Sequence, residues 1–107
     1  MRIEKDVKSK TLTAYLTGDI DHHTALPMRE AIDEAVLSDK PEKLILDYGD
    51  VVFMDSSGIG LIMGRHRLMQ TINGKIEVRN VPISLYKVVR LSGIEKLGKV
   101  SIKEEKI

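Results

Sequence analysis

The stretch KLILDYGDVVFMDSSGIG, residues 43–60, joins an apolar run to an acidic, hydroxyl-bearing junction and then to a glycine-rich apolar segment. Residues 43–48 have a continuously apolar centre, which is typical of a strand covered on both faces, and such strands belong to sheets with parallel pairing. We therefore expect helices to pack on this sheet. Apolar side chains then recur at roughly helical intervals as far as Ile72, so residues 55–57 are expected to start a helix.

Upstream of this stretch, the sequence predicts a hairpin followed by a helix. Residues 2–8 and 11–18 are expected to form two strands, because apolar and polar side chains alternate along the second of them. Residues 25–38 repeat apolar side chains at helical spacing, and Thr24 before them is a residue type favoured at the N-cap. An amphipathic helix is therefore predicted to begin after Thr24.

Downstream, the sequence predicts a strand, a helix and a short last strand. Residues 75–81 alternate apolar and charged side chains, and residues 83–93 carry apolar side chains at helical spacing up to a final glycine. Residues 94–98 predict an extra turn, and residues 99–103 predict the last strand. The predicted order is β-β-α-β-α-β-α-β, which indicates an α/β fold with helices packed on a mixed sheet.

Length and composition indicate one small domain, residues 1–107, with no targeting signal. The 17 basic and 16 acidic residues give a formal charge of +1 and are scattered along the chain, which argues against binding to nucleic acid or to an anionic membrane. Cysteine is absent, so thiol chemistry and disulfides are excluded, and no apolar run is long enough to span a membrane. We expect a protein of the reducing cytoplasm.

The junction at Asp55, Ser56 and Ser57 is the strongest candidate site. A helix N-terminus has unpaired N–H groups and a partial positive charge, so any of these three side chains suits an N-cap. Capping alone is the simplest interpretation, but two adjacent serines exceed what one cap needs and leave a hydroxyl free. A phosphate on such a serine would be tolerated by the helix start and repelled by Asp55.

Glycines in the first turns of this predicted helix require an explanation. Glycine destabilises a helix by about 1 kcal/mol relative to alanine, yet Gly58, Gly60 and Gly64 follow the junction. Gly60 and Gly64 lie one turn apart and leave a bare strip of backbone. Two interpretations are equally supported by the spacing: another molecule approaches the strip, or the strip packs against the sheet.

Enzymatic and metal sites are not supported by the sequence, so we expect no catalytic residue, no cofactor and no metal. The nucleophile elbow G-x-S-x-G fails because Met54 and Asp55 precede Ser56. His22 and His23 are adjacent and cannot readily converge on one ion, and no acidic cluster accompanies them. No phosphate-binding glycine motif occurs.

A second polar segment, residues 17–25, leaves the second predicted strand and enters the first predicted helix. Its Asp19 and Asp21 can simply turn the chain and cap the helix. In a parallel arrangement, however, the loops that enter two successive helices can lie at the same end of the sheet. This segment and the junction at Asp55 could then form one surface.

Two motifs taken together resemble a known family. LTGDIDHHTA, residues 16–25, and VVFMDSSGIGLIMGRHRLMQ, residues 51–70, resemble the bacterial anti-sigma factor antagonists of the STAS domain family, most closely its sporulation members in the sigma F pathway. The similarity spans nearly the whole chain in element order. It implies a STAS-type mixed sheet of four to five strands flanked by helices. Asp19, Ile20 and Ile59 depart from the common residues of the family, which leaves the identity of the partner open.

The resemblance also implies a switch between binding partners. In that family an anti-sigma factor, itself a serine kinase, phosphorylates the serine that corresponds to Ser56; the unphosphorylated antagonist binds this kinase and releases the sigma factor. A dedicated phosphoserine phosphatase restores the antagonist. The residues expected to contact the partner are Asp21, Asp55, Ser56, Ser57, Gly58 and Gly60.

Two other functions remain as hypotheses. The same fold can serve as a regulatory STAS scaffold subunit of a transporter or of a stress-signalling complex. An enzyme that binds or hydrolyses nucleotides is supported only by the anion-favouring helix start at Asp55. We regard the chain as a substrate and ligand of other proteins.

Overall fold

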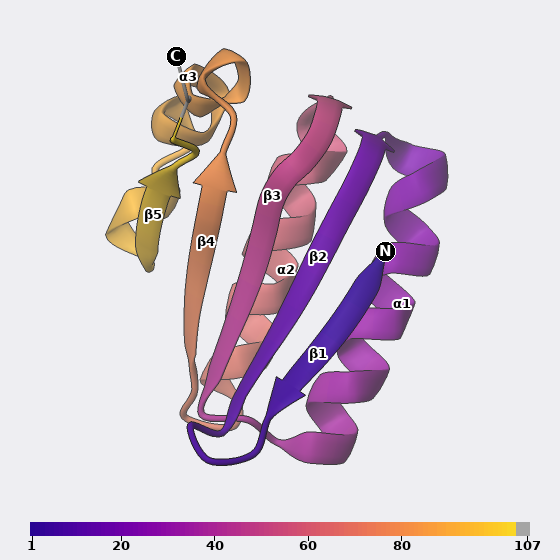
Figure 1. The fold of residues 1–107 in the computed structure, drawn as a ribbon, viewed down its shortest axis with the longest axis vertical. Coiled ribbons are helices and arrows are strands. Elements are labelled where there is room, and N and C mark those ends of the chain that lie inside the picture. Colours follow the sequence, from indigo (N-terminus) through magenta and orange to yellow (C-terminus); the bar gives the residue numbers. More distant parts are fainter. Residues whose placement is uncertain (105–107) are drawn as a thin grey trace.

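A five-stranded mixed sheet forms the centre of the structure, a computed structural model that describes residues 1–104 (Figure 1). The strands are β1 (Arg2–Asp6), β2 (Thr11–Ile20), β3 (Lys43–Met54), β4 (Lys75–Val81) and β5 (Lys99–Ile102). The helices are α1 (His22–Asp39), α2 (Ser56–Gln70), α3 (Ile83–Leu91) and the short 3₁₀ helix η1 (Ile94–Lys96). The predicted α/β class and order of elements are confirmed.

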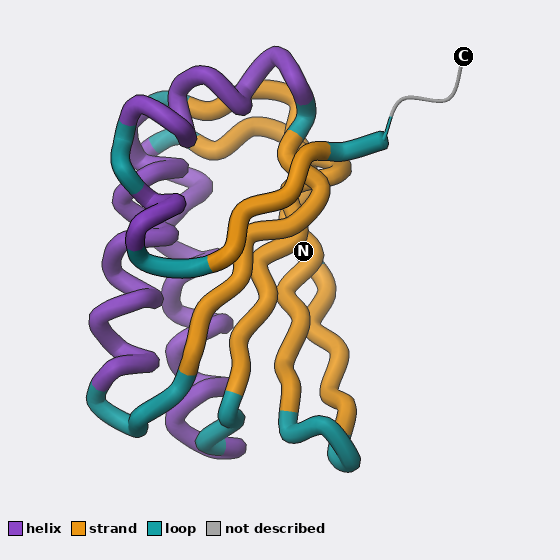
Figure 2. Tube along the Cα trace, turned by 90° about the vertical axis from the view of Figure 1, so that its left-hand side faces the viewer, coloured by secondary structure: helices purple, strands orange, loops and turns teal. Residues whose placement is uncertain are grey.

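The strands follow one another across the sheet in the order of the sequence, β1-β2-β3-β4-β5. β1 pairs antiparallel with β2, and the other neighbouring pairs are parallel. Each parallel step therefore needs a crossover, which α1, α2 and α3 with η1 supply. α1 and α2 lie along the same face of the sheet (Figures 1 and 2).

The core lies between the sheet and these helices. Leu12 on β2 pairs in register with Leu44 on β3, which pairs with Ile76 on β4, and all three side chains are buried. The alternating apolar residues predicted on the second strand, Leu12, Ala14 and Leu16, are at most 2% exposed. The pattern of period two therefore identified the face of β2 that the helices cover.

The other face of the sheet carries no helix in the part of the chain that the structure describes (Figure 2). Helices therefore cover β3 on one face only, although residues 44–48 are all buried, as expected of a strand covered on both faces. Asp47, on the open face of this central strand, is nevertheless only 6% exposed. Long polar side chains from β4 shield this face: Arg79 Nε lies 3.1 Å from Asp47 Oδ2, and Glu77 Oε1 lies 2.7 Å from Lys43 Nζ.

Two predicted boundaries are corrected by the structure. The strand predicted to end at residue 48 continues to Met54, because β3 keeps pairing with β2 across two irregularities in the register. The first helix begins at His22, with Asp21 as its N-cap, whereas Thr24 is the third helical residue and completes a capping box. Both Asp and Thr suit an N-cap, and the length of β2 decides between them.

Candidate functional site

The two polar segments lie together at one end of the sheet. Ile20 and Met54 end the parallel strands β2 and β3 and are paired in register. The N–H of Asp55 donates a hydrogen bond to the carbonyl of Ile20 at 3.1 Å. α1 and α2 therefore start side by side at the carboxyl ends of these strands (Figure 1). The prediction that the two loops share one end of the sheet is confirmed.

Asp55 is the N-cap of α2, and this assignment leaves Ser56 free. The Oδ1 atom of Asp55 accepts a hydrogen bond from the Ser57 N–H at 2.7 Å, while its carbonyl accepts one from the Gly58 N–H at 3.0 Å. Ser56 is the first helical residue and is exposed. Its hydroxyl makes no hydrogen bond with the described residues. The acid thus satisfies the helix end, and the hydroxyl faces solvent.

Asp21 plays the same part at the start of α1. Its Oδ1 accepts hydrogen bonds from the N–H groups of His23 at 2.8 Å and Thr24 at 2.9 Å. The Thr24 hydroxyl in turn accepts a hydrogen bond from the Asp21 N–H at 2.9 Å. The backbone hydrogen bonds from Thr24 and His23 lower the pKa of Asp21 below its usual value of 3.8. Asp21 is therefore a carboxylate at neutral pH, beside the start of α2.

The glycines of α2 fall into two classes. Gly58 is buried, and a Cβ there would lie 2.6 Å from Met54 Sδ, so the close packing of α2 on β3 requires a glycine. A Cβ on Gly60 or Gly64 would have no atom within 4 Å. Packing of the Gly60–Gly64 strip against the sheet, one of the two interpretations of the sequence, is therefore excluded.

A buried tyrosine holds the first turn of α2 on β3, a role that sequence reasoning missed. Tyr48 is fully buried, and its hydroxyl donates a hydrogen bond to the carbonyl of Gly58 at 2.9 Å. Burial raises the pKa of Tyr48, so the phenol stays protonated and keeps donating. This hydrogen bond fixes the helix start that carries Ser56.

A cleft of about 400 Å³ lies between the N-terminal halves of α1 and α2. Its polar lining residues are His22, Arg29, Ser57 and Arg65, and its other lining residues are Ala25, Leu26, Gly60 and Leu61. Sequence reasoning missed this cleft. The available signal was Arg65 itself, which lies one turn after Leu61 and one turn before Met69, on the buried side of α2.

Arg65 is held in place by an ion pair between the two helices. Its side chain is 7% exposed, and its Nε lies 2.7 Å from Asp33 Oδ1 on α1. A hydrogen bond of 3.3 Å also joins Arg65 Nη2 to Asp33 Oδ2. Burial lowers the pKa of Arg65 and Asp33 opposes this effect, so the guanidinium stays charged. The pair fixes the distance between α1 and α2 beside Ser57.

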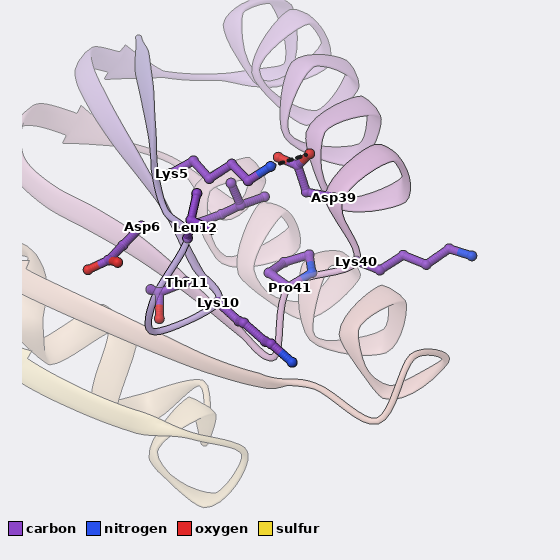
Figure 3. Close-up of a pocket in the computed structure, with 9 residues that line it drawn as sticks. Lys5, Asp6, Lys10, Thr11, Leu12, Asp39, Lys40 and Pro41 are labelled. Carbon is purple, nitrogen blue, oxygen red and sulfur yellow. Dashed lines mark hydrogen bonds and ion pairs between the residues drawn. The ribbon is translucent and has the colours of Figure 1, made fainter.

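A separate hollow of about 330 Å³ lies at the opposite end of α1, next to the turn between β1 and β2. Figure 3 shows one of its walls, where Lys5 Nζ lies 3.1 Å from Asp39 Oδ1. None of the residues predicted for the site lines this hollow. The end of the sheet at Asp21 and Asp55 therefore remains the candidate site.

Residues 1–104 contain no group of three or more His, Asp or Glu side chains arranged to hold a metal ion. Among the helices described, none is long and apolar enough to cross a membrane.

The sequence and the fold of this chain are both similar to those of known proteins. The model of the STAS domain family matches residues 2–106. The anti-sigma F factor antagonist of Paenibacillus polymyxa is 33% identical over 97 residues, which cover 91% of this chain and 83% of that protein. The anti-sigma factor antagonist SpoIIAA in its unphosphorylated form superimposes with a TM-score of 0.79 at 29% identity, covering 94% of this chain and 86% of that one. The phosphorylated form of SpoIIAA, a Bacillus cell fate determinant, gives a TM-score of 0.72 at 29% identity, covering 94% and 89%.

Proposed function

Since this chain belongs to the STAS domain family, we propose that it is an anti-sigma factor antagonist controlled by phosphorylation of Ser56. In its unphosphorylated form it binds an anti-sigma factor that is a serine kinase, and the sigma factor is released. Transfer of a phosphate from ATP to Ser56 ends this binding, and a phosphoserine phosphatase reverses the modification. The chain is the substrate in this cycle, and the enzymes are its partners.

The observation that carries the proposal is the free hydroxyl of Ser56 at an exposed helix start. Asp55 caps α2, so Ser56 is available to a kinase without loss of the helix. The N–H groups of the first turn tolerate a phosphate, which adds close to two negative charges. The relatives named above include structures of an antagonist in both phosphorylation states, which supports the same site chemistry here.

The change in charge explains why phosphorylation would end binding. A phosphate on Ser56 lies beside the carboxylates of Asp55 and Asp21, and desolvating it in an interface is unfavourable unless a partner cation meets it. A loss of about 4 kcal/mol weakens binding about a thousandfold. This is enough to switch between partners.

The surface proposed for the kinase comprises Asp21, Asp55, Ser56, Ser57, Gly58 and Gly60. Asp21, Ser56 and Gly60 reach the surface and contact the partner directly. Gly58 contributes indirectly, because its missing side chain lets α2 pack on Met54 and so positions Ser56. The resemblance to sigma F antagonists supports a role for this protein in sporulation, in the cytoplasm.

Ser56 variants test the proposal. We expect Ser56→Ala to bind the anti-sigma factor kinase about as tightly as the wild type and to gain no phosphate from ATP. Ser56→Asp should weaken binding at least about tenfold, because it places a charge in the interface. Isothermal titration calorimetry measures the affinity, and intact mass spectrometry with peptide mapping locates the phosphate.

Ser57→Ala is the matched control, because it changes the neighbouring hydroxyl and leaves Ser56 in place. This variant should still be phosphorylated. Phosphate on Ser57 instead of Ser56, or equal affinity of Ser56→Asp and Ser56→Ala for an active kinase, would contradict the proposed switch.

A further inference from the structure

The cleft between α1 and α2 contains a positive charge that plays no part in the proposed phosphorylation of Ser56. Asp33 pairs with the buried Arg65, so these two charges cancel. Arg29 lines the same cleft, is exposed, and has no ion-pair partner within residues 1–104. The cleft therefore carries a net positive charge, next to the acidic N-caps Asp21 and Asp55.

The fold itself does not require the open space at Gly60 that shapes the cleft. Gly60 is exposed, and neither packing nor a left-handed backbone requires a glycine there. An alanine would stabilise the helix at this position, so the absence of a side chain is a disadvantage to the isolated fold. Ala25 and Leu61 form an apolar wall, and the neighbouring Leu26 is 45% exposed. The cleft is thus open, partly apolar and basic.

The cleft is continuous with the surface proposed for the kinase. Ser57 and Gly60 line it and belong to the first turns of α2, directly after Ser56. A protein that covers the Ser56 hydroxyl would reach Arg29 by passing over the bare backbone at Gly60. Ser56 and Gly60 are four residues apart, so they lie on the same face of α2, one turn apart.

We propose that this cleft is a second anchor for the anti-sigma factor and receives an acidic side chain carried on an apolar segment of that partner. The carboxylate meets the Arg29 guanidinium, and its apolar neighbours lie against Ala25 and Leu61. The acidic caps lie beside the basic cleft, and this arrangement sets the orientation of the partner. Only a partner that places a basic group against the caps and an acidic group in the cleft matches both. This inference rests on the proposed function and deepens it.

Charge changes at Arg29 test the anchor in the full chain. We expect Arg29→Gln to weaken binding of the unphosphorylated protein to the anti-sigma factor kinase about tenfold and Arg29→Glu about a hundredfold at low salt. The affinity of both variants should also depend less on salt than that of the wild type. Titration calorimetry at low and high salt gives these values, and thermal unfolding confirms that each variant folds.

Lys75→Glu is the matched control, because Lys75 is an exposed cation at the start of β4, away from the carboxyl ends of the strands where Ser56 lies. This charge reversal should leave the affinity within about twofold of the wild type. Gly60→Gln is a second test: its side chain occupies the cleft without changing the charge, and it should weaken binding about tenfold as well.

The failures of the two proposals are distinguishable. If Arg29→Glu binds as tightly as the wild type while Ser56→Asp binds at least about tenfold more weakly, the anchor is overturned and the switch stands. A loss of affinity in Lys75→Glu equal to that in Arg29→Glu would also overturn the anchor, because long-range attraction would then account for both. A wild-type chain that does not bind the kinase overturns both proposals.

Discussion

At the scale of single residues, Gly58 and Gly60 show how one residue type serves two purposes within a turn. The carbonyl of Gly58 accepts the hydrogen bond from Tyr48, and a Cβ on this residue would overlap Met54. Gly60 has open space around it. Only the first of these glycines is needed by the fold.

Replacing each of the two glycines by alanine should have opposite effects on stability. Gly58→Ala should destabilise the protein by about 1–3 kcal/mol, because the new methyl group overlaps Met54 in a packed interior. Gly60→Ala should stabilise it by up to about 1 kcal/mol, since alanine is the better helix former and meets no atom. Urea unfolding followed by circular dichroism measures both. Equal free energies of unfolding for the two variants would contradict the packing described for Gly58.

At the scale of elements, the site depends on where two strands end. β2 and β3 stop at the paired residues Ile20 and Met54, and each is followed directly by an aspartate that caps a helix. The two carboxylates serve as caps. The imidazoles of His22 and His23 at the start of α1 and the hydroxyl of Ser56 at the start of α2 are therefore exposed. The ion pair between Asp33 and the buried Arg65 then holds the two helices beside each other.

The cap of α1 predicts a pH dependence of stability. The pKa of Asp21 is lower in the folded protein than its usual value of 3.8. The carboxylate therefore stabilises the fold above this value, and the contribution is lost as the pH falls through the lower folded pKa. Asp21→Asn keeps a capping side chain without the charge. Its melting temperature should lie below that of the wild type at neutral pH, and the difference should close below about pH 4.

Asp19→Asn is the control for this experiment, because it removes one negative charge at the same end of the sheet without touching a helix cap. A difference between wild type and Asp21→Asn that stays constant from neutral to acidic pH would show that the charge of Asp21 does not stabilise α1.

At the scale of the whole molecule, the sheet is a platform with one covered face. The core packs side chains of α1, α2, α3 and η1 against the inner face of the sheet, and β3 is the central strand. The open face is shielded by the side chains of Arg79, Lys43 and Glu77. The side chains packed between β3 and α2 therefore hold the start of α2 in place.

Truncation of a buried side chain in this core should cause a large loss of stability. Leu46 on β3 is fully buried, and Leu46→Ala should destabilise the protein by about 2–5 kcal/mol. Val52 lies on the same strand and is 76% exposed, so Val52→Ala should change the stability by less than about 1 kcal/mol. Denaturant unfolding gives both values. Similar losses for the two variants would mean that β3 is not packed as described.

The sequence by itself determined the elements, their order and the residues at the junction. Period-two and helical spacing depend on local geometry, so they identified the covered face of β2 and the helix that begins after Asp55. Tertiary structure alone decided which aspartate caps α1, how far β3 extends and which glycines the fold needs. These outcomes depend on the pairing of Ile20 with Met54 and on the approach of α2 to Met54, contacts between residues that are distant in the sequence. The cleft at Arg29 belongs to the same class, because only the packing of α1 against α2 brings its walls together.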